Sequence, residues 1–356
     1  MTHQENAPLS VTPGAIRFNT DSMKLEYYRG GPVGFGTTTT TGEWVNLTTD
    51  TPDIQTGGAR GVFTGGYIAP THVATTDYIT ITTTGNGINF ENLVTARGFH
   101  ACCSSSTRGL SAGGISPAAT NNIEFITISS TGSAASFGSL SGNLSYGAGC
   151  SSSTRGIFAI GRTQPTATLT NTIDYVTIAS TGNGVDFGDT SLARNELGSF
   201  QSSTRGVFCG GTQSPLTPSI QNIIDFITIS TLGNAADFGD LINLGEQGGG
   251  SSNSVRGLYA GKEAPAVSNV IEYITIASLG NAIDFGDLTV ARNQLCGVAS
   301  PTRVAWAGGI NGPTLQNIID YVTIMSTGNA VDFGDLQSAR RRLPSQGISN
   351  GHGGLG

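Results

Sequence analysis

Short runs in which apolar and polar residues alternate recur along most of the chain and are typical of β-strands. The clearest run starts with an acidic residue and continues through an aromatic residue to Ile-Thr-Ile or Val-Thr-Ile. It occurs six times, at residues 77–81, 124–128, 174–178, 225–229, 272–276 and 320–324. A second run follows each of these, as at residues 284–288, with its Phe always 13 positions after the acidic residue. This regularity predicts six copies of one structural unit.

Two further runs complete each unit. One opens with Arg and ends in small residues, as at 205–211, and the run before it ends in a Ser-rich turn, as at 101–107. Four short strands per unit predict an antiparallel sheet that cannot bury both of its faces alone. Sheets must therefore pack face to face, and a closed ring leaves none uncovered. The sequence predicts an all-β fold, a six-bladed β-propeller.

The two ends of the repeat region predict how the ring closes. The first unit begins at Arg60 without a full strand before it, whereas residues 339–349 repeat the start of a unit and have no further strands after them. We expect this last stretch to supply the missing first strand of the first sheet, which would tie the ring shut.

Composition supports the β class and excludes some functions. The chain has 52 Gly, only 12% charged residues and a net charge of -7, so it lacks the basic footprint of a nucleic-acid-binding protein. No apolar stretch has the length of a membrane span. Residues 1–6 have neither a basic nor an apolar region, so we expect a protein made in the cytoplasm without a signal peptide of the usual kind.

Cysteine and histidine offer little chemistry. The five cysteines fall inside strand-like runs and are expected to be small core residues: Cys102, Cys103, Cys150, Cys209 and Cys296. The four histidines are too scattered to complete a metal site with them. We expect no metal and no cofactor.

The few recurring charges are expected to have structural roles. In an antiparallel blade the start of the third strand and the connection that precedes the next first strand lie at the same end. Four ion pairs follow from this: Arg97 with Glu124, Arg194 with Asp225, Arg292 with Asp320, and Arg340 with Asp77. Asp174 and Glu272 lack such a partner. The Arg that opens each second strand is expected to cap its blade; the alternative is a ring of six arginines that binds an anion at a channel mouth.

Variation concentrates in the connection between the second and third strands. Counted from Arg to acidic residue, it spans 16 positions from Arg108 to Glu124 and 20 from Arg205 to Asp225. All six connections should emerge on one face, where a partner would be recognised, although drift in exposed loops would give the same pattern. The candidate partner-binding residues are Pro70, His72, Pro117, Gln164, Pro165, Gln213, Pro215, Pro218, Lys262, Pro265, Asn311 and Pro313.

Residues 1–50 stand outside the repeat, so we expect an N-terminal segment followed by a propeller over 51–356. Residues 15–18 and 23–28 alternate as a hairpin, and residues 43–47 predict a third strand. Such a segment buries too little to stand alone and should dock elsewhere. The candidate docking residues are Ile16, Phe18, Leu25, Tyr27 and Trp44.

The repeat resembles the kelch repeat over residues 57–356. The resemblance rests on an Arg before the first strand, a second strand ending in Gly-Gly, an acidic-aromatic third strand and an Asn before the fourth. It departs from kelch in one respect, because Phe stands where kelch units usually carry Trp: Phe90, Phe137, Phe187, Phe238, Phe285 and Phe333. Phe can still supply the large ring between blades. The resemblance implies a kelch-like propeller but transfers no partners.

The N-terminal segment carries a second resemblance. Residues 14–20, 25–28 and 42–45 are similar to a module of bacteriophage tail-fibre and other virion structural proteins. The resemblance implies a virion protein, a tail fibre, baseplate-peripheral or capsid-decorating component. Its N-terminal segment would dock to other virion proteins and its propeller would bind host-surface glycan or protein. A homo-oligomer in the assembled particle is compatible with this.

Two alternatives stay open. One is a propeller enzyme acting on polysaccharide, which the near-equal treatment of the six units disfavours because catalysis needs one asymmetric cluster. The other is an intracellular kelch-type adaptor, which the N-terminal segment disfavours because it lacks the usual helical partner domains. We expect a non-enzymatic protein.

Overall fold

The computed structural model describes residues 15–19, 24–30, 42–46, 59–163, 166, 168–213, 219–263 and 266–355. The chain divides into two compact units, Met1–Thr51 and Pro52–Gly356. The division falls one residue from the boundary expected after residue 50.

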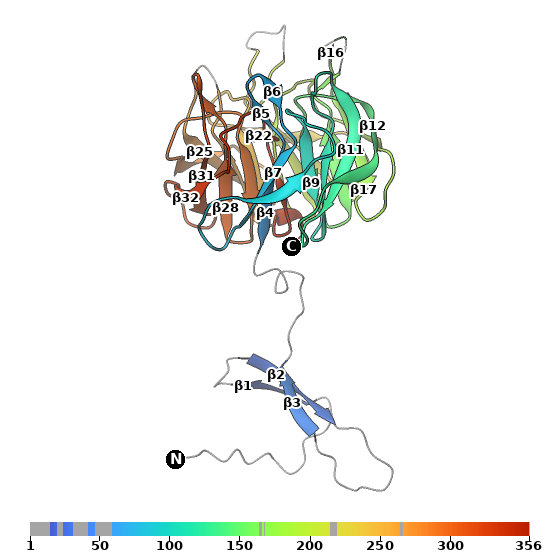
Figure 1. Ribbon diagram of the computed structural model, residues 1–356, viewed down its shortest axis with the longest axis vertical. Helices are drawn as coiled ribbons and strands as arrows, with labels where there is room; N and C mark the ends of the chain where they lie inside the picture. Colours follow the sequence, from blue (N-terminus) through green and yellow to red (C-terminus); the bar gives the residue numbers. More distant parts are fainter. Residues whose placement is uncertain are drawn as a thin grey trace. The chain divides into compact units, whose positions relative to one another are not determined.

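The larger unit is a β-propeller of six four-stranded antiparallel sheets, which confirms the predicted all-β fold (Figure 1). The first strands of neighbouring blades pack against one another around the axis. From the axis outward, blade 1 is β33 (Ile348–Ser349), β4 (Arg60–Thr64), β7 (Thr75–Thr80) and β8 (Ile88–Asn92), and blade 2 is β9 (Ala101–Ser104), β10 (Arg108–Ala112), β11 (Thr120–Thr127) and β12 (Ala135–Leu144). Blade 3 is β13 (Ala148–Ser151), β14 (Arg155–Ala159), β17 (Thr172–Thr177) and β18 (Val185–Asp189), and blade 4 is β19 (Gly198–Gln201), β20 (Arg205–Cys209), β21 (Ile223–Thr228) and β22 (Ala236–Asp240). Blade 5 is β23 (Gly249–Ser252), β24 (Arg256–Ala260), β25 (Val270–Thr275) and β26 (Ile283–Asp287), and blade 6 is β27 (Cys296–Ala299), β28 (Arg303–Ala307), β31 (Ile318–Thr323) and β32 (Val331–Asp335).

The ring closes as predicted, because a strand from the C-terminal stretch completes blade 1. β33 pairs antiparallel with β4, with Ile348 opposite Val62 and Ser349 opposite Gly61. The innermost strand of blade 1 is therefore the last described strand in the sequence.

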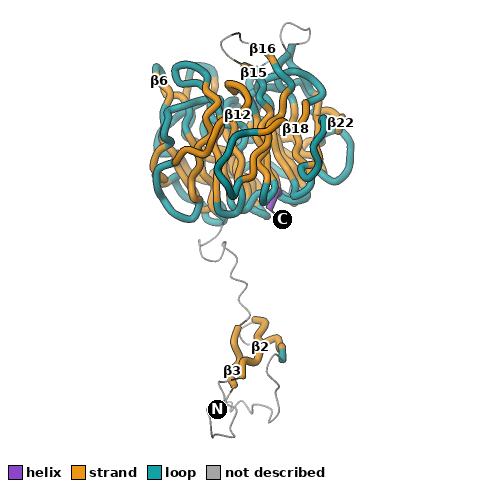
Figure 2. The backbone as a smooth tube through the Cα atoms, turned by 90° about the vertical axis from the view of Figure 1, so that its right-hand side faces the viewer, coloured by secondary structure: helices purple, strands orange, loops and turns teal. Residues whose placement is uncertain are grey.

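The ring has two distinct ends. Three connections between second and third strands carry a small ribbon: β5 (Tyr67–Ile68) with β6 (Thr71–His72), β15 (Arg162–Thr163) with β16 (Thr168–Leu169), and β29 (Ile310–Asn311) with β30 (Thr314–Leu315). In Figure 2, β6, β15 and β16 lie at one end, and the short 3-10 helix η1 (Gly353–Leu355) lies at the other. We call these the loop end and the tail end.

Hydrophobic cores lie between neighbouring blades. One cluster combines Phe137 of blade 2 with Phe158 and Val176 of blade 3. The Phe of each fourth strand is buried and packs edge-on against the aromatic residue of the third strand, as for Tyr273 and Phe285, whose ring centroids are 5.8 Å apart. The expected role of Phe as the large ring between blades is confirmed. The five cysteines are buried and free, as expected for core residues.

The Arg that opens each second strand links its blade to the next. Arg205 lies over the Phe226 ring, 4.6 Å from its centroid, and donates from Nη1 to the carbonyl oxygen of Ile276, 2.8 Å away. Equivalent bonds join Arg60 to Ile128, Arg108 to Ile178, Arg155 to Ile229, Arg256 to Ile324 and Arg303 to Ile81. Because the third strand lies away from the axis, these arginines cap blades and do not surround a channel mouth.

The outer edge of a fourth strand is covered by a turn of the neighbouring blade. Gly233 N donates to the carbonyl oxygen of Phe187 (2.9 Å), and Asn234 Oδ1 accepts from Asp189 N (3.1 Å). Turns of the same kind reach from blade to blade around the ring and protect strand edges that would otherwise be open for pairing. Among the described residues, no helix has the length and apolar character needed to cross a membrane.

Candidate functional site

The recurring charges form buried ion pairs. Arg194 Nη1 lies 3.0 Å from Asp225 Oδ2, Arg292 Nη1 3.1 Å from Asp320 Oδ2, Arg340 Nη1 2.7 Å from Asp77 Oδ2, and Arg97 pairs with Glu124. The structure thus brings together all four expected pairs. None of these side chains is more than 4% exposed, so they are out of reach of a ligand and hold each blade to the connection before it.

The two carboxylates that lack an arginine have other partners. Glu272 pairs with Lys262, whose side chain is 3% exposed. Asp174 accepts hydrogen bonds from Ser141 N (2.7 Å) and Ser141 Oγ (2.9 Å). The prediction that Lys262 lies on the partner-binding face is therefore wrong, because a buried carboxylate holds its ammonium group inside the blade.

The other loop candidates lie at the loop end where they are described. Pro70, Pro117, Asn311 and Pro313 are exposed, and His72 and Gln213 are half-buried. Gln164, Pro165, Pro215, Pro218 and Pro265 lie outside the described residues. The variable connections share one end of the ring, and their binding of a partner stays a prediction.

Sequence reasoning missed a ring of six residues at the axis. Each blade contributes one residue in the left-handed backbone region, on the connection that leads to its first strand: Arg342 (φ 58°), Phe99 (55°), Tyr146 (58°), Glu196 (60°), Gln247 (60°) and Gln294 (58°). We call these the mouth residues. Non-glycine residues rarely adopt this conformation, and its repetition in all six blades marks a built feature.

The mouth residues lie in a circle at the loop end of the axis, and five backbone hydrogen bonds link them in a chain that runs from Arg342 to Gln294. Phe99 N donates to the carbonyl oxygen of Arg342 (2.8 Å), and Tyr146 N donates to that of Phe99 (3.0 Å). The same bond joins Glu196 to Tyr146 (2.7 Å), Gln247 to Glu196 (3.1 Å) and Gln294 to Gln247 (2.7 Å). These bonds fix the backbone, so the side chains start from rigid positions.

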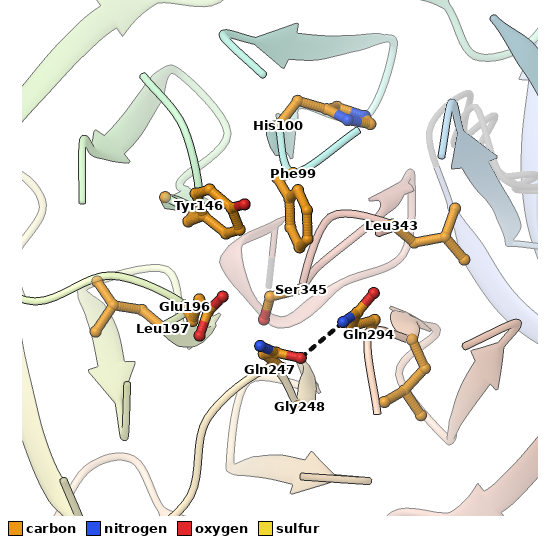
Figure 3. A pocket seen from close by; sticks show the side chains of 12 residues that line it. Phe99, His100, Tyr146, Glu196, Leu197, Gln247, Gly248, Gln294, Leu343 and Ser345 are labelled. Atoms are coloured by element: carbon orange, nitrogen blue, oxygen red, sulfur yellow. Dashed lines mark hydrogen bonds between the residues drawn. The ribbon is translucent and has the colours of Figure 1, made fainter. Parts of the chain in front are cut away.

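The mouth side chains differ in chemistry around the circle (Figure 3). Phe99 and Tyr146 pack together with ring centroids 4.0 Å apart. The Arg342 guanidinium lies 5.0 Å from the Phe99 centroid and 4.2 Å from that of Tyr67. On the opposite side, Gln294 Nε2 donates to Gln247 Oε1 (2.8 Å). Six equivalent positions of one repeat thus carry a cation, two aromatic rings, an acid and two amides.

The acidic part of the mouth holds a proton near neutral pH. Burial raises the pKa of Glu196, and hydrogen bonds with Gln247 and Glu246 oppose this rise. Burial and the charge of Glu196 raise the pKa of Glu246 to about 8. The two carboxyl groups therefore titrate together, and the pair keeps a shared proton to a higher pH than an exposed glutamate does.

A hollow of about 30 Å³ lies inside the circle, with Ser345 at its centre (Figure 3). Three buried polar atoms of its lining have no hydrogen-bond partner among the described residues: His100 Nδ1, Gln294 Oε1 and Ser345 Oγ. Buried polar groups normally have partners, so these atoms are positions at which a ligand or a water is expected to bind.

Beneath the hollow, the C-terminal segment fills the axis. The carbonyl oxygen of Ser345 accepts from Gly250 N (3.0 Å) and Gly297 N (3.1 Å). At the tail end, His352 Nε2 lies 2.8 Å from the Ser104 carbonyl oxygen and its Nδ1 2.7 Å from Gln201 Nε2. Burial lowers the pKa of His352 to about 4. The axis beneath the hollow therefore holds protein.

Gly354 shows how closely this segment fits. A Cβ atom at this position would lie 1.9 Å from the Ser151 carbonyl oxygen, a distance that no side chain tolerates. The tail thus seals the axis with backbone. No group of three or more His, Cys, Asp or Glu side chains in the described part of the chain could hold a metal ion.

The smaller unit is a three-stranded antiparallel sheet of β1 (Ile16–Asn19), β2 (Lys24–Gly30) and β3 (Gly42–Asn46). Arg17 Nε donates to Glu26 Oε2 (2.8 Å), and its guanidinium lies 4.2 Å from the Trp44 centroid. The Trp44 ring also contacts Tyr28 edge-on, at 5.3 Å between centroids.

The register divides the candidate docking residues between the two faces of this sheet. Ile16 lies opposite Tyr27, and Trp44 lies opposite Tyr28, so Trp44 is on the other face from Ile16 and Tyr27. Ile16 is 64% exposed. Phe18 and Leu25 lie opposite each other in the register, and their side chains are outside the described part.

One signal in the sequence could have found part of the mouth. In four blades the mouth residue stands two positions after the recurring buried Arg: Phe99 after Arg97, Glu196 after Arg194, Gln294 after Arg292, and Arg342 after Arg340. A variable residue beside an invariant one is typical of a recognition position. A comparison of the chain with models of known protein families and with curated proteins finds no match.

Proposed function

We propose that this chain is a non-enzymatic structural protein of a bacteriophage virion, which docks by its N-terminal sheet and presents the propeller for binding to a host surface or to protein. One observation carries the binding role: six equivalent mouth positions of a near-uniform repeat carry different side chains, at the same end as the variable connections. A repeat that is uniform except for varied side chains at one end is typical of a scaffold with a recognition face.

The virion role rests on the N-terminal residues. Residues 14–20, 25–28 and 42–45 are similar to a module of phage tail-fibre and virion proteins. The sheet that these residues build is too small to be stable alone, and it exposes Ile16. A docking role would give that exposed face a partner.

A propeller enzyme acting on polysaccharide is the second candidate, because Glu196 and Glu246 have raised pKa values beside two aromatic rings. Glycosidases place the two carboxyl groups about 5 to 9.5 Å apart on either side of the bond they cleave. Glu196 and Glu246 hydrogen-bond to each other, so a glycosidic carbon does not fit between them. This favours binding over catalysis.

Antibodies raised against the full chain test the proposed location. Particles from the source culture should be labelled in electron micrographs, and the antibodies should reduce their adsorption to host cells. If the antibodies label the particles but do not reduce adsorption, the propeller would brace the particle and would not bind the host. Absence of the chain from purified particles would overturn the virion proposal, and release of reducing sugar from host polysaccharide by the pure protein would overturn the non-enzymatic one.

A further inference from the structure

We infer that the mouth residues form a binding site for the end group of a neutral saccharide, which inserts a hydroxyl or hydroxymethyl group into the hollow above Ser345. This inference rests on the proposed binding function and names its ligand class. It places recognition at the axis and not on the surrounding loops.

The first argument is the chemistry of the unpartnered atoms. Gln294 Oε1 can only accept a hydrogen bond, whereas His100 Nδ1 and Ser345 Oγ can donate or accept. A sugar hydroxyl is both a donor and an acceptor, so it can satisfy such a mixed set. The His100 side chain is fully buried and belongs to the lining of the hollow, and a buried nitrogen without a partner is costly.

The second argument is the aromatic pair. Phe99 and Tyr146 stand side by side at the rim of the hollow (Figure 3). Aromatic rings next to a few well-placed polar groups are the usual lining of a small-molecule site. Here the rings would hold the apolar face of a sugar ring while its end group reaches inward.

The third argument is charge and size. Arg342 is stacked on Tyr67 and Phe99 and does not line the hollow, whereas Glu196 does, so an anionic group in the hollow would meet an acidic side chain. The hollow of about 30 Å³ accommodates one or two waters, which matches a single hydroxymethyl group and excludes a whole ring. An uncharged end group suits this lining better than a carboxylate.

The fourth argument is rigidity. The chain of backbone hydrogen bonds fixes the mouth residues before a ligand arrives, so little conformational entropy is lost on binding. One end group makes few contacts, and we expect a dissociation constant of about 1 mM for a single site. Many copies on one particle would raise the overall affinity.

Saturation-transfer NMR on the full chain tests the site. The probes are the methyl glycosides of glucose, galactose and N-acetylglucosamine, with methyl glucuronide as the charged comparison. At least one neutral glycoside should receive saturation. Its affinity should fall about tenfold in Tyr146→Leu, which removes the aromatic ring, and in Gln294→Met, which removes the amide at similar volume. Thr71→Ala, a change of an exposed residue of β6 at the same end of the ring, is the matched control and should bind as the parent does. Thermal unfolding of each variant checks the fold.

Each other outcome overturns the inference. Binding of glucuronide alone would make the site anionic, and no binding of any glycoside would remove it. Binding that survives both mouth changes would place recognition elsewhere, for example on the loops. If the mouth variants still bind to host cells, the proposed adhesion stands without this site. If the parent chain binds to no host cell surface, the proposed adhesion itself is wrong.

Discussion

The loop end and the tail end of the propeller axis are built from the same repeat but differ in their side chains and in how they are closed. At the loop end, six positions carry six side chains chosen from four chemical classes. At the tail end, Ser-Thr turns repeat from blade to blade, and the backbone of residues 351–355 closes the axis. The comparison indicates that contacts at the tail end stabilise the ring, so that side chains at the loop end can vary without unfolding it. The following changes test that division, from the largest expected effect to the smallest.

Removing residues 344–356 should be the most damaging change. It takes away β33, the Ser345 contacts and residues 351–355, which we call the plug because their backbone closes the axis. It also exposes the edge of β4 and the axis-facing side of five blades. We expect an insoluble chain or a loss of more than about 4 kcal/mol in the free energy of unfolding. Urea unfolding, followed by the fluorescence of buried Trp306, measures it. An unchanged midpoint would mean that the tail closes nothing.

Arg340→Met should cost about 3–5 kcal/mol, because it leaves the carboxylate of Asp77 buried without its counter-charge. The adjacent Arg341→Met, which removes a half-buried guanidinium, should cost far less. Adding Asp77→Leu to Arg340→Met should recover part of the loss. Equal effects of the two single changes in urea unfolding would contradict the assignment.

Acid should loosen the plug before it unfolds the ring. The pKa of His352 lies at about 4 in the folded protein against 6.5 as its ordinary value. Its contribution is complete above pH 6.5 and is lost as the pH falls toward 4, about 3 kcal/mol in all. The hydrogen-exchange protection factors of residues 351–355, which are corrected for the intrinsic pH dependence of exchange, should fall over this range while the outer strands stay protected. His352→Gln should remove the pH dependence of these protection factors, and protection factors that do not change between pH 6.5 and 4 would contradict a role for His352 in holding the tail.

Glu246→Gln should have the smallest effect and the opposite sign with pH. The pKa of Glu246 rises from 4.5 to about 8 on folding, so its contribution is present at low pH and is lost as the pH rises toward 8. Because the side chain is only half-buried, we expect a slightly lower melting temperature for the parent at pH 8 than at pH 5. The variant should lose this slope, and a parallel slope in both proteins would argue against the shared proton.

The sequence predicts the scaffold of this protein well and its recognition end poorly. The constant spacings fix strands that pair with their neighbours, so the six blades, the closure by β33 and the four Arg–carboxylate pairs could all be predicted. The mouth residues could not, because no residue type marks a left-handed position that is not glycine. Lys262 was misplaced for a related reason, since a lysine in a variable loop looks exposed until its buried partner, Glu272, is known. The glycines of residues 351–354 predict no element, and only their close approach to the inner strands reveals the plug.

Chain order gives the closure of blade 1 a consequence for synthesis. Five blades can form their sheets while translation proceeds, but β4 has no inner neighbour until residues 348–349 have left the ribosome. A ribosome that stops early therefore releases a ring with one unpaired strand edge, and unpaired edges promote aggregation. Only chains translated past this point can close the ring, so an incomplete chain differs from a complete one by the exposed edge of β4.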